Sequence, residues 1–189
     1  KVVKSGCGAA LLRDPRHLAE IVRSMNEISD VPITVKIRSG WDSRHLNYTE
    51  VALRTEEAGA AMVTLHARTR AQGYSGRADH TQTASLKKAI TVPVVASGDV
   101  FTPQNIQSIL DFTGCDGVMI ARGAIGNPWI FSRTKEYFRT GKLPGEPSVE
   151  EKITKALEHL EFSIEYRGEH TACKEMRKHL SAYTKGLTG

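Results

Sequence analysis

The sequence predicts an α/β fold in which four strand–helix units form a parallel sheet and a helical segment follows. Two observations predict it. Short runs rich in β-branched residues alternate four times with amphipathic stretches, and the pattern becomes purely helical after about residue 144. Short connections between each strand and the next helix are typical of parallel βα units. The carboxyl ends of the strands, where ligands bind in such folds, should therefore lie at one edge.

Start and stop signals locate the elements of the first 143 residues. Asp14-Pro15 combines an N-cap with a proline at the first helical position, and apolar residues recur at helical spacing as far as Ile28. Asn47 is expected to cap a second helix that ends at Gly59. A third helix is expected over residues 82–90, and Thr102-Pro103 begins a fourth. The expected strands lie in "VPITVKIRSG", "AMVTLH", "VPVVAS" and "GVMIA".

A Gly/Pro-rich stretch, "GKLPGEPS", separates these units from the helical segment. Ile153, Leu157, Leu160 and Ile164 share one helical face, and Gly168 interrupts the pattern before a last helix. We therefore expect one domain over residues 1–143 and a second over residues 144–189. Four βα units do not close an eight-stranded barrel, so they form either an open sheet or the C-terminal half of a TIM (β/α)8 barrel, and the half-barrel is the more economical interpretation.

Composition sets broad limits on function. The chain has 189 residues, of which 25% are charged and 40% hydrophobic, as in a soluble globular protein. A net charge of +5 is compatible with a polyanionic partner but also with ordinary solvation. Cys7, Cys115 and Cys173 lack metal-ligand spacing, so we expect no metal site, three small apolar fillers and a reducing compartment such as the cytoplasm. No apolar run is long enough to span a membrane.

Polar residues and glycines follow the third and fourth expected strands. Ser97, Gly98 and Asp99 end "VPVVAS", and Arg122 and Gly123 come after "GVMIA". In a barrel, the loops after the last two strands commonly bind a phosphate, because glycine lets the backbone approach and arginine adds a cation. The alternative is that the glycines only turn the chain.

Cationic residues and a histidine mark the ends of the first two strands. Lys36 and Arg38 share a face by period two, near the end of their strand, where they meet either an anion or solvent. His66 ends the next strand and leads into "HARTRAQGYSG", which contains Arg68. A histidine at a strand end beside such neighbours is a candidate ligand contact.

Six motifs in order resemble the tRNA-dihydrouridine synthases, above all the bacterial B-type subgroup. The resemblance covers essentially the whole chain. The motifs are "KVVKSGCGAALL", "TVKIRSGW", "LHARTRAQGYSGRAD", "SGDV", "ARGAIGNPWIF" and "EMRKHLSAYTKGL".

The resemblance implies an FMN-dependent enzyme that reduces the C5=C6 bond of uridines in tRNA, with NADPH as reductant. It implies that Lys36 and His66 contact the flavin. It also implies that Arg68 binds the target uracil or its phosphate and that a helical domain grips the tRNA. Basic residues of that helical part, Arg177 and Lys178 among them, are candidates for contact with the RNA backbone. The residues implied to hold the phosphate and ribityl chain are Ser97, Gly98, Asp99, Ala121, Arg122 and Gly123.

The chain departs from the family pattern in several places. The family's catalytic cysteine lies in a Gly-Cys-Pro segment upstream of the position of Lys1, so we expect a fragment that is inactive alone, and Cys7 is assigned no catalytic role. Ser97 replaces a usual asparagine, Ala121 a usual glycine and His80 a usual tryptophan. Two alternatives stay open at this point: an RNA-binding module without catalysis, and another FMN-dependent barrel enzyme that acts on a small molecule.

Overall fold

The computed structural model describes residues 2–187 and divides into two compact units, which we describe separately. The first unit contains the residues up to Val100 together with Gln104–Ile120. The second contains Phe101–Pro103 and the residues from Ala121 onward. The units divide near residue 120, and the domain boundary expected between residues 143 and 144 stays a prediction.

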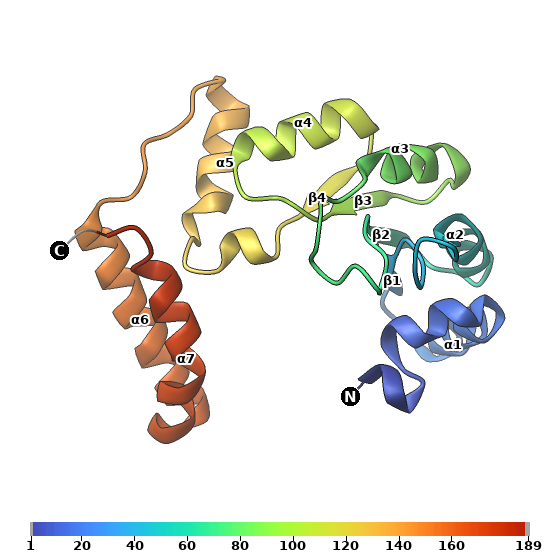
Figure 1. Ribbon diagram of the computed structural model, residues 1–189, viewed down its shortest axis with the longest axis horizontal. Helices are drawn as coiled ribbons and strands as arrows, with labels where there is room; N and C mark the ends of the chain where they lie inside the picture. The colour runs from blue at the N-terminus through green and yellow to red at the C-terminus, as the bar shows by residue number, and fades with distance from the viewer. Residues whose placement is uncertain (1, 188–189) are drawn as a thin grey trace. The chain divides into compact units, whose positions relative to one another are not determined.

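A parallel sheet of four strands forms the centre of the first unit (Figure 1). The strands follow chain order, so that β2 and β3 are central while β1 and β4 are the edges. All three neighbouring pairs are parallel, which confirms the predicted α/β class. The strands are β1 (Thr34–Arg38), β2 (Met62–His66), β3 (Val94–Ser97) and β4 (Gly117–Met119).

Helices connect successive strands, as the alternating pattern predicts. Asp14 accepts a hydrogen bond from the backbone N–H of His17 at 3.0 Å, so the predicted N-cap of the first helix is confirmed. The third helix begins two residues before the expected Gln82, because Asp79 caps it through the N–H of Thr81. The helices are α1 (Pro15–Ile28), α2 (Tyr48–Glu57), α3 (His80–Ala89) and α4 (Pro103–Thr113), preceded by the 3₁₀ turns η1 (Val2–Ser5) and η2 (Gly8–Arg13).

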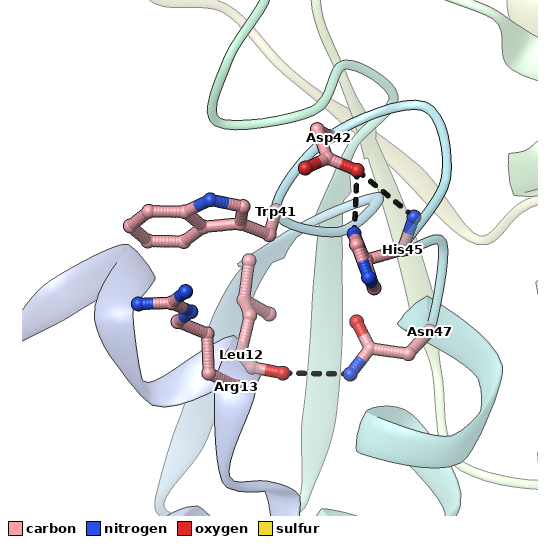
Figure 2. A pocket seen from close by; sticks show the side chains of 6 residues that line it. All are labelled: Leu12, Arg13, Trp41, Asp42, His45 and Asn47. Carbon is pink, nitrogen blue, oxygen red and sulfur yellow. Dashed lines mark hydrogen bonds and ion pairs between the residues drawn. The ribbon is translucent and has the colours of Figure 1, made fainter.

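Asn47 precedes α2 as expected, but the predicted capping hydrogen bond is wrong. The side chain makes no bond to the first turn of α2. Its Nδ2 donates instead to the carbonyl oxygen of Leu12 at 2.6 Å (Figure 2). Asn47 therefore ties the start of α2 to the end of η2, a long-range role that the local sequence does not reveal.

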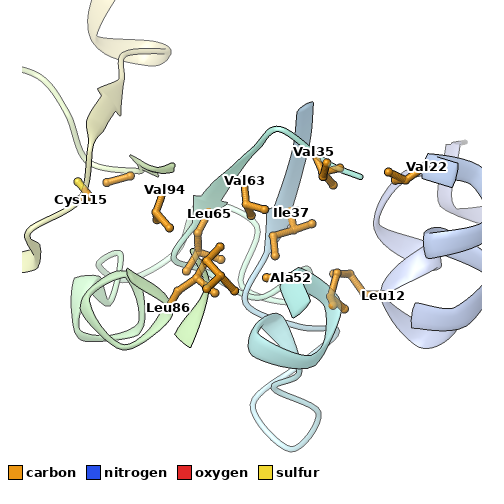
Figure 3. Close-up of a cluster of buried hydrophobic side chains, with 14 of the residues drawn as sticks. Leu12, Val22, Val35, Ile37, Ala52, Val63, Leu65, Leu86, Val94 and Cys115 are labelled. Atoms are coloured by element: carbon orange, nitrogen blue, oxygen red, sulfur yellow. The ribbon is translucent and has the colours of Figure 1, made fainter. Parts of the chain in front are cut away.

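The core lies on one face of the sheet (Figure 3). Alternate strand residues point to opposite faces, and the apolar set packs against the helices. Buried residues of this cluster from the strands are Val35, Ile37, Val63, Leu65, Val94 and Ala96, and those from the helices include Val22, Val51, Ala52, Leu86, Ile106 and Ile109. Burial of this face fixes the other alternate positions, including Lys36 and His66, on the opposite face.

The second unit is helical. The two helices expected after residue 144 are confirmed as α6 and α7, and a capping box of Ser148 and Glu151 begins α6. Gly168, with φ of +73°, separates the two helices. The sequence analysis missed α5 entirely. The elements are η3 (Arg122–Ala124), α5 (Trp129–Thr140), α6 (Val149–Arg167) and α7 (Glu169–Tyr183). Among the residues that the structure describes, none of the helices has the length and apolar character that crossing a bilayer requires.

Truncation of Leu65 tests the one-sided core. Leu65 lies on central strand β2 and is 0% exposed, so Leu65→Ala should lower the free energy of unfolding by about 2–5 kcal/mol through lost contacts and a residual cavity. Chemical denaturation would measure the change. Leu53→Ala, on the exposed side of α2, is the matched control and should change stability much less. Equal effects of both substitutions would contradict this description of the core.

Candidate active site

Strand pairing gathers the predicted polar residues on one face of the sheet. Lys36 pairs with Thr64 in the register of β1 and β2, and Arg38 pairs with His66. His66 pairs in turn with Ser97 on β3. Residues paired across parallel strands point to the same side, so these side chains share the face opposite the apolar core. The shared face of Lys36 and Arg38 is the one that period two predicts.

Lys36 is a cation in a partly dehydrated setting. Its side chain is exposed, while Val35 and Ile37 on either side are buried. Partial burial, and secondly the positive charge of Arg38, lower the pKa of Lys36 below its ordinary value of 10.5. Both effects disfavour the charged amine when nothing neutralises it. An anion bound on this face would offset both effects.

Arg38 organises the loop that follows β2. Its Nη1 donates to the carbonyl oxygens of Thr69 and Gly73, each at 2.9 Å. Its guanidinium also lies 5.8 Å from the ring centroid of Tyr74. The Tyr74 ring lies 6.3 Å from that of His66, so the loop holds an exposed aromatic beside the histidine. Tyr74 lies in the "HARTRAQGYSG" segment but was not predicted as a site residue.

Arg68, which is buried, and Asp99, which is partly exposed, form an ion pair that joins the segments after β2 and β3. The Arg68 side chain is 2% exposed, and its Nη2 donates to Oδ1 and Oδ2 of Asp99 at 2.8 and 2.7 Å. Arg68 also donates to the carbonyls of Ser75 and Gly76. The Asp99 carboxylate accepts a further bond from the N–H of Ala78 at 2.7 Å. Nε and Nη2 of Arg68 therefore position two loops, whereas its Nη1 is buried without a hydrogen-bond partner among the described residues. The predicted contact of Arg68 with substrate stays a prediction.

The Gly98–Asp99 turn requires its glycine. Gly98 has φ of +114°, and a Cβ there would lie 2.9 Å from the Ala78 Cβ and 3.0 Å from His66 Cδ2. Asp99 follows with φ of +54°, the one positive φ outside glycine among the described residues. Its side-chain bonds to Arg68 and Ala78 hold this uncommon conformation. The turn thus packs its backbone against His66, which brings two of the predicted cofactor residues together.

His80, which the sequence left without interpretation, forms a hydrogen bond with the Gly98 turn. Its Nε2 lies 3.1 Å from the carbonyl oxygen of Gly98, so the tautomer with a proton on Nε2 donates to the turn. Burial, the largest cause, lowers the pKa of His80, although the Gly98 hydrogen bond and the charge of Asp99 oppose the decrease. The neutral ring is therefore favoured.

Ala121, Arg122 and Gly123 follow β4 and belong to the second unit. The guanidinium of Arg122 lies 5.6 Å from the ring centroid of Phe101. Ala121 has φ of −120°, so the position does not need the left-handed freedom of glycine. Ser97 on β3 pairs with Met119 on β4, so this segment begins two residues beyond a strand that adjoins β3. A joint phosphate site with the Gly98 turn stays a prediction.

Gly126 is a tightly packed residue that the sequence analysis did not single out. A Cβ there would lie 2.6 Å from the Ala182 carbonyl carbon and 2.7 Å from the Tyr183 nitrogen. The chain after η3 therefore touches the backbone at the end of α7. On the same helix, Arg177 and Lys178 are exposed, and the described residues give neither an ion-pair partner.

The cysteines form no centre in the part of the chain that the structure describes. Cys115 is buried, as a small apolar filler should be. Cys7 and Cys173 are exposed, so the interpretation as fillers is wrong for these two. The described region also contains no group of three or more His, Cys, Asp or Glu side chains that could hold a metal ion.

Similarity to known proteins extends over the whole chain. A family model described as dihydrouridine synthase (Dus) matches residues 1–189. The probable tRNA-dihydrouridine synthase 1 of Synechocystis sp. is 44% identical over 189 residues, which cover all of this chain and 53% of that protein. The tRNA-dihydrouridine synthase B of Pseudomonas aeruginosa is 40% identical over 190 residues, which cover 100% of this chain and 57% of that protein. The chain spans about half the length of the curated relatives it matches.

The substitution Asp99→Asn tests the ion pair with Arg68. It keeps the shape and the tolerance for positive φ but leaves the buried Arg68 charge without its carboxylate, so we expect a loss of about 3 kcal/mol in the free energy of unfolding. Urea denaturation would measure the loss. Glu136→Gln breaks the exposed pair with Arg139 and should give no measurable change. A normal stability for Asp99→Asn would show that the pair is dispensable.

A pH titration tests His80. Because its pKa is lower in the folded chain, the unfolded chain binds a proton first as the pH falls. The His80 contribution to stability is therefore complete above about pH 6.5 and decreases as the pH falls from there through the lower folded pKa. His80→Gln keeps a donor but cannot titrate, so it should flatten the pH dependence of unfolding in this window. The same slope in both proteins would exclude His80 as its source.

Proposed function

Because the chain belongs to the dihydrouridine synthase family, we propose that it forms part of an enzyme that reduces uridine to 5,6-dihydrouridine in tRNA. FMN is the proposed bound redox group and NADPH the reductant. The reaction adds a hydride equivalent and a proton across the C5=C6 double bond and converts NADPH to NADP⁺. Curated relatives carry the name tRNA-dihydrouridine synthase, which supports this choice of substrate.

The main support for the proposal is the polar face of the sheet. Lys36, Arg38 and His66 stand on it in register, and the Gly98 turn packs against His66 without an intervening side chain. Such an edge of parallel strands, with cations and a closely approaching backbone, suits a ligand that carries a phosphate and an electron-poor ring.

The residues present fit FMN. An exposed amine at Lys36, whose pKa is lowered by its surroundings, would gain from a negative charge on the cofactor. The side-chain-free turn at Gly98 gives a phosphate or ribityl chain access to the backbone. The proposed binding set is Lys36, His66, Ser97, Gly98, Asp99, Ala121, Arg122 and Gly123. When bound, FMN would supply the two-electron chemistry that protein side chains lack.

The chain's own residues would bind and orient the reactants. The Lys36 ammonium would stabilise negative charge that develops on the reduced cofactor. Arg68 and Asp99 would hold the β2 and β3 loops in place, and His66 would line the site that they shape. Arg68, Arg177 and Lys178 are the proposed contacts to tRNA, and a uridine in folded RNA must leave its stack to be reached.

We also propose the larger architecture. The sheet has two edge strands, and its polar face carries Lys36, Arg38 and His66, as expected for four of the eight strands of a TIM barrel whose interior binds the cofactor. The helices after residue 143 would form part of a tRNA-binding domain. Because the chain spans about half of its relatives, the 189 residues alone should lack activity. Loss of a general acid typically costs about 10² to 10⁴ in rate, and loss of half the cofactor site adds to that.

Measurement of dihydrouridine tests this function. The intact protein, incubated with FMN, NADPH and unmodified tRNA, should form dihydrouridine that is detected by mass spectrometry of digested tRNA, with matching NADPH oxidation. Lys36→Met should lower the rate on the order of 10²-fold through lost charge stabilisation. Lys88→Met, an exposed lysine on α3, is the control and should keep full activity. An intact protein that binds tRNA without flavin absorbance or product would contradict the proposal.

A further inference from the structure

Trp41, just after β1, lies beneath two guanidinium groups from distant parts of the chain. The Arg13 carbon Cζ is 4.4 Å from the Trp41 ring centroid, and that of Arg70 is 4.7 Å from it. Both distances are within the range of a cation–π interaction. Two backbone hydrogen bonds join the segments that carry Trp41 and Arg70. The Arg70 N–H donates to the Gly40 carbonyl and the Ala71 N–H donates to the Trp41 carbonyl, each at 2.9 Å.

Neither arginine is neutralised within the described residues. Other arginines of the chain have carboxylate partners, as Arg54 does with Glu50 and Arg68 with Asp99. The described region offers none to Arg13 or Arg70, and both side chains are exposed. Two fixed cations on an aromatic platform therefore face solvent with their charge available to an anion.

A pocket of about 400 Å³ adjoins this platform (Figure 2). Leu12, Arg13 and Trp41 form one side of it, and Asp42, His45 and Asn47 form the other. Asp42 is engaged, since its Oδ1 accepts from the His45 ring at 2.7 Å. Asn47 donates to Leu12, but its Oδ1 is buried without a hydrogen-bond partner among the described residues. The pocket thus combines an aromatic wall, a cation and an unused acceptor.

We propose that this surface, formed by Arg13, Trp41, Arg70 and the adjoining pocket, binds a nucleotide of the tRNA other than the uridine that is reduced. The inference rests on the proposed function. The guanidinium groups suit a backbone phosphate, and the Asn47 Oδ1 suits an amino or imino N–H of a base. The pocket has the size of small-ligand sites. Unstacked RNA bases are commonly held by aromatic side chains and guanidinium planes, whereas duplex RNA hides its base edges.

The surface adjoins the candidate active site through the β2 loop. Arg70 follows Arg68 and Thr69, which form bonds to Asp99 and Arg38, and it binds the backbone of Gly40. A nucleotide bound here would therefore position the RNA relative to the loop that holds Tyr74 beside His66. This is a positioning role for the substrate and not part of the chemical step.

Salt-dependent tRNA binding by the intact protein tests the proposal. Arg13→Gln and Arg70→Gln should each raise Kd for tRNA several-fold, and each should reduce the slope of log K against log salt by about 0.7 to 0.9. Arg23→Gln, an exposed arginine on α1, removes the same charge and is the matched control, expected to change Kd less than about twofold. Equal effects of the three substitutions would overturn the proposal.

Tryptophan fluorescence distinguishes RNA binding at Trp41 from a purely structural role of Trp41 and the two arginines. In a Trp129→Phe background Trp41 is the remaining tryptophan of these 189 residues. Stacking against RNA should quench its fluorescence with the same Kd, and the same background with Trp41→Phe, which should lose this quenching, assigns the signal to Trp41. A brace without ligand contact predicts no quenching, which would also overturn the proposal. The KM for NADPH should not change in the arginine variants; a higher KM with unchanged tRNA affinity would assign the pocket to the dinucleotide instead.

The outcomes separate the two proposals. Failure of the unaltered protein to bind or reduce tRNA would defeat the proposed function. If the unaltered protein binds and reduces tRNA while the Arg13 and Arg70 variants match Arg23→Gln, this inference alone fails.

Discussion

The ion pair of Arg68 and Asp99 is the constraint on which the candidate site depends. One guanidinium, almost without solvent exposure, binds a carboxylate from the turn after the next strand and two carbonyls from its own loop. That network stabilises the positive φ at Asp99, and with it the turn that sets Gly98 against His66. A buried charge is costly without its partners, so movement of either loop alone would leave Arg68 without its carboxylate.

One face of the sheet forms the core, and the other face carries the polar residues of the candidate site. Alternate residues of each strand face opposite sides, and parallel register places like positions beside each other. The apolar side packs against helices, and the other side carries Lys36, Arg38 and His66. A one-residue slip of β1 would bury its cations and expose Val35 and Ile37. The same hydrophobic alternation that forms the core therefore aligns the cationic residues.

Much of the fold could be predicted from the sequence, because its signals are local. Short runs rich in β-branched residues predicted the strands, and the Asp14-Pro15 cap predicted the start of α1. Features that depend on distant partners could not be predicted, such as Asn47 bound to Leu12 and Arg68 bound to Asp99. The helix α5 was not predicted, although Gly141, with φ of +71°, ends it as a left-handed C-cap. The residues of the candidate site were identified by strand ends and resemblance, whereas the platform of Arg13, Trp41 and Arg70 has no sequence periodicity at all.

The contact of Gly126 with the backbone of α7 has a consequence for how this chain can vary. The two segments meet with no room for a methyl group, so every other residue type at position 126 would force the last helix away from the turn. The turn at Gly126 and the end of α7 are therefore closely fitted to each other. A change in the path of either segment requires a matching change in the other.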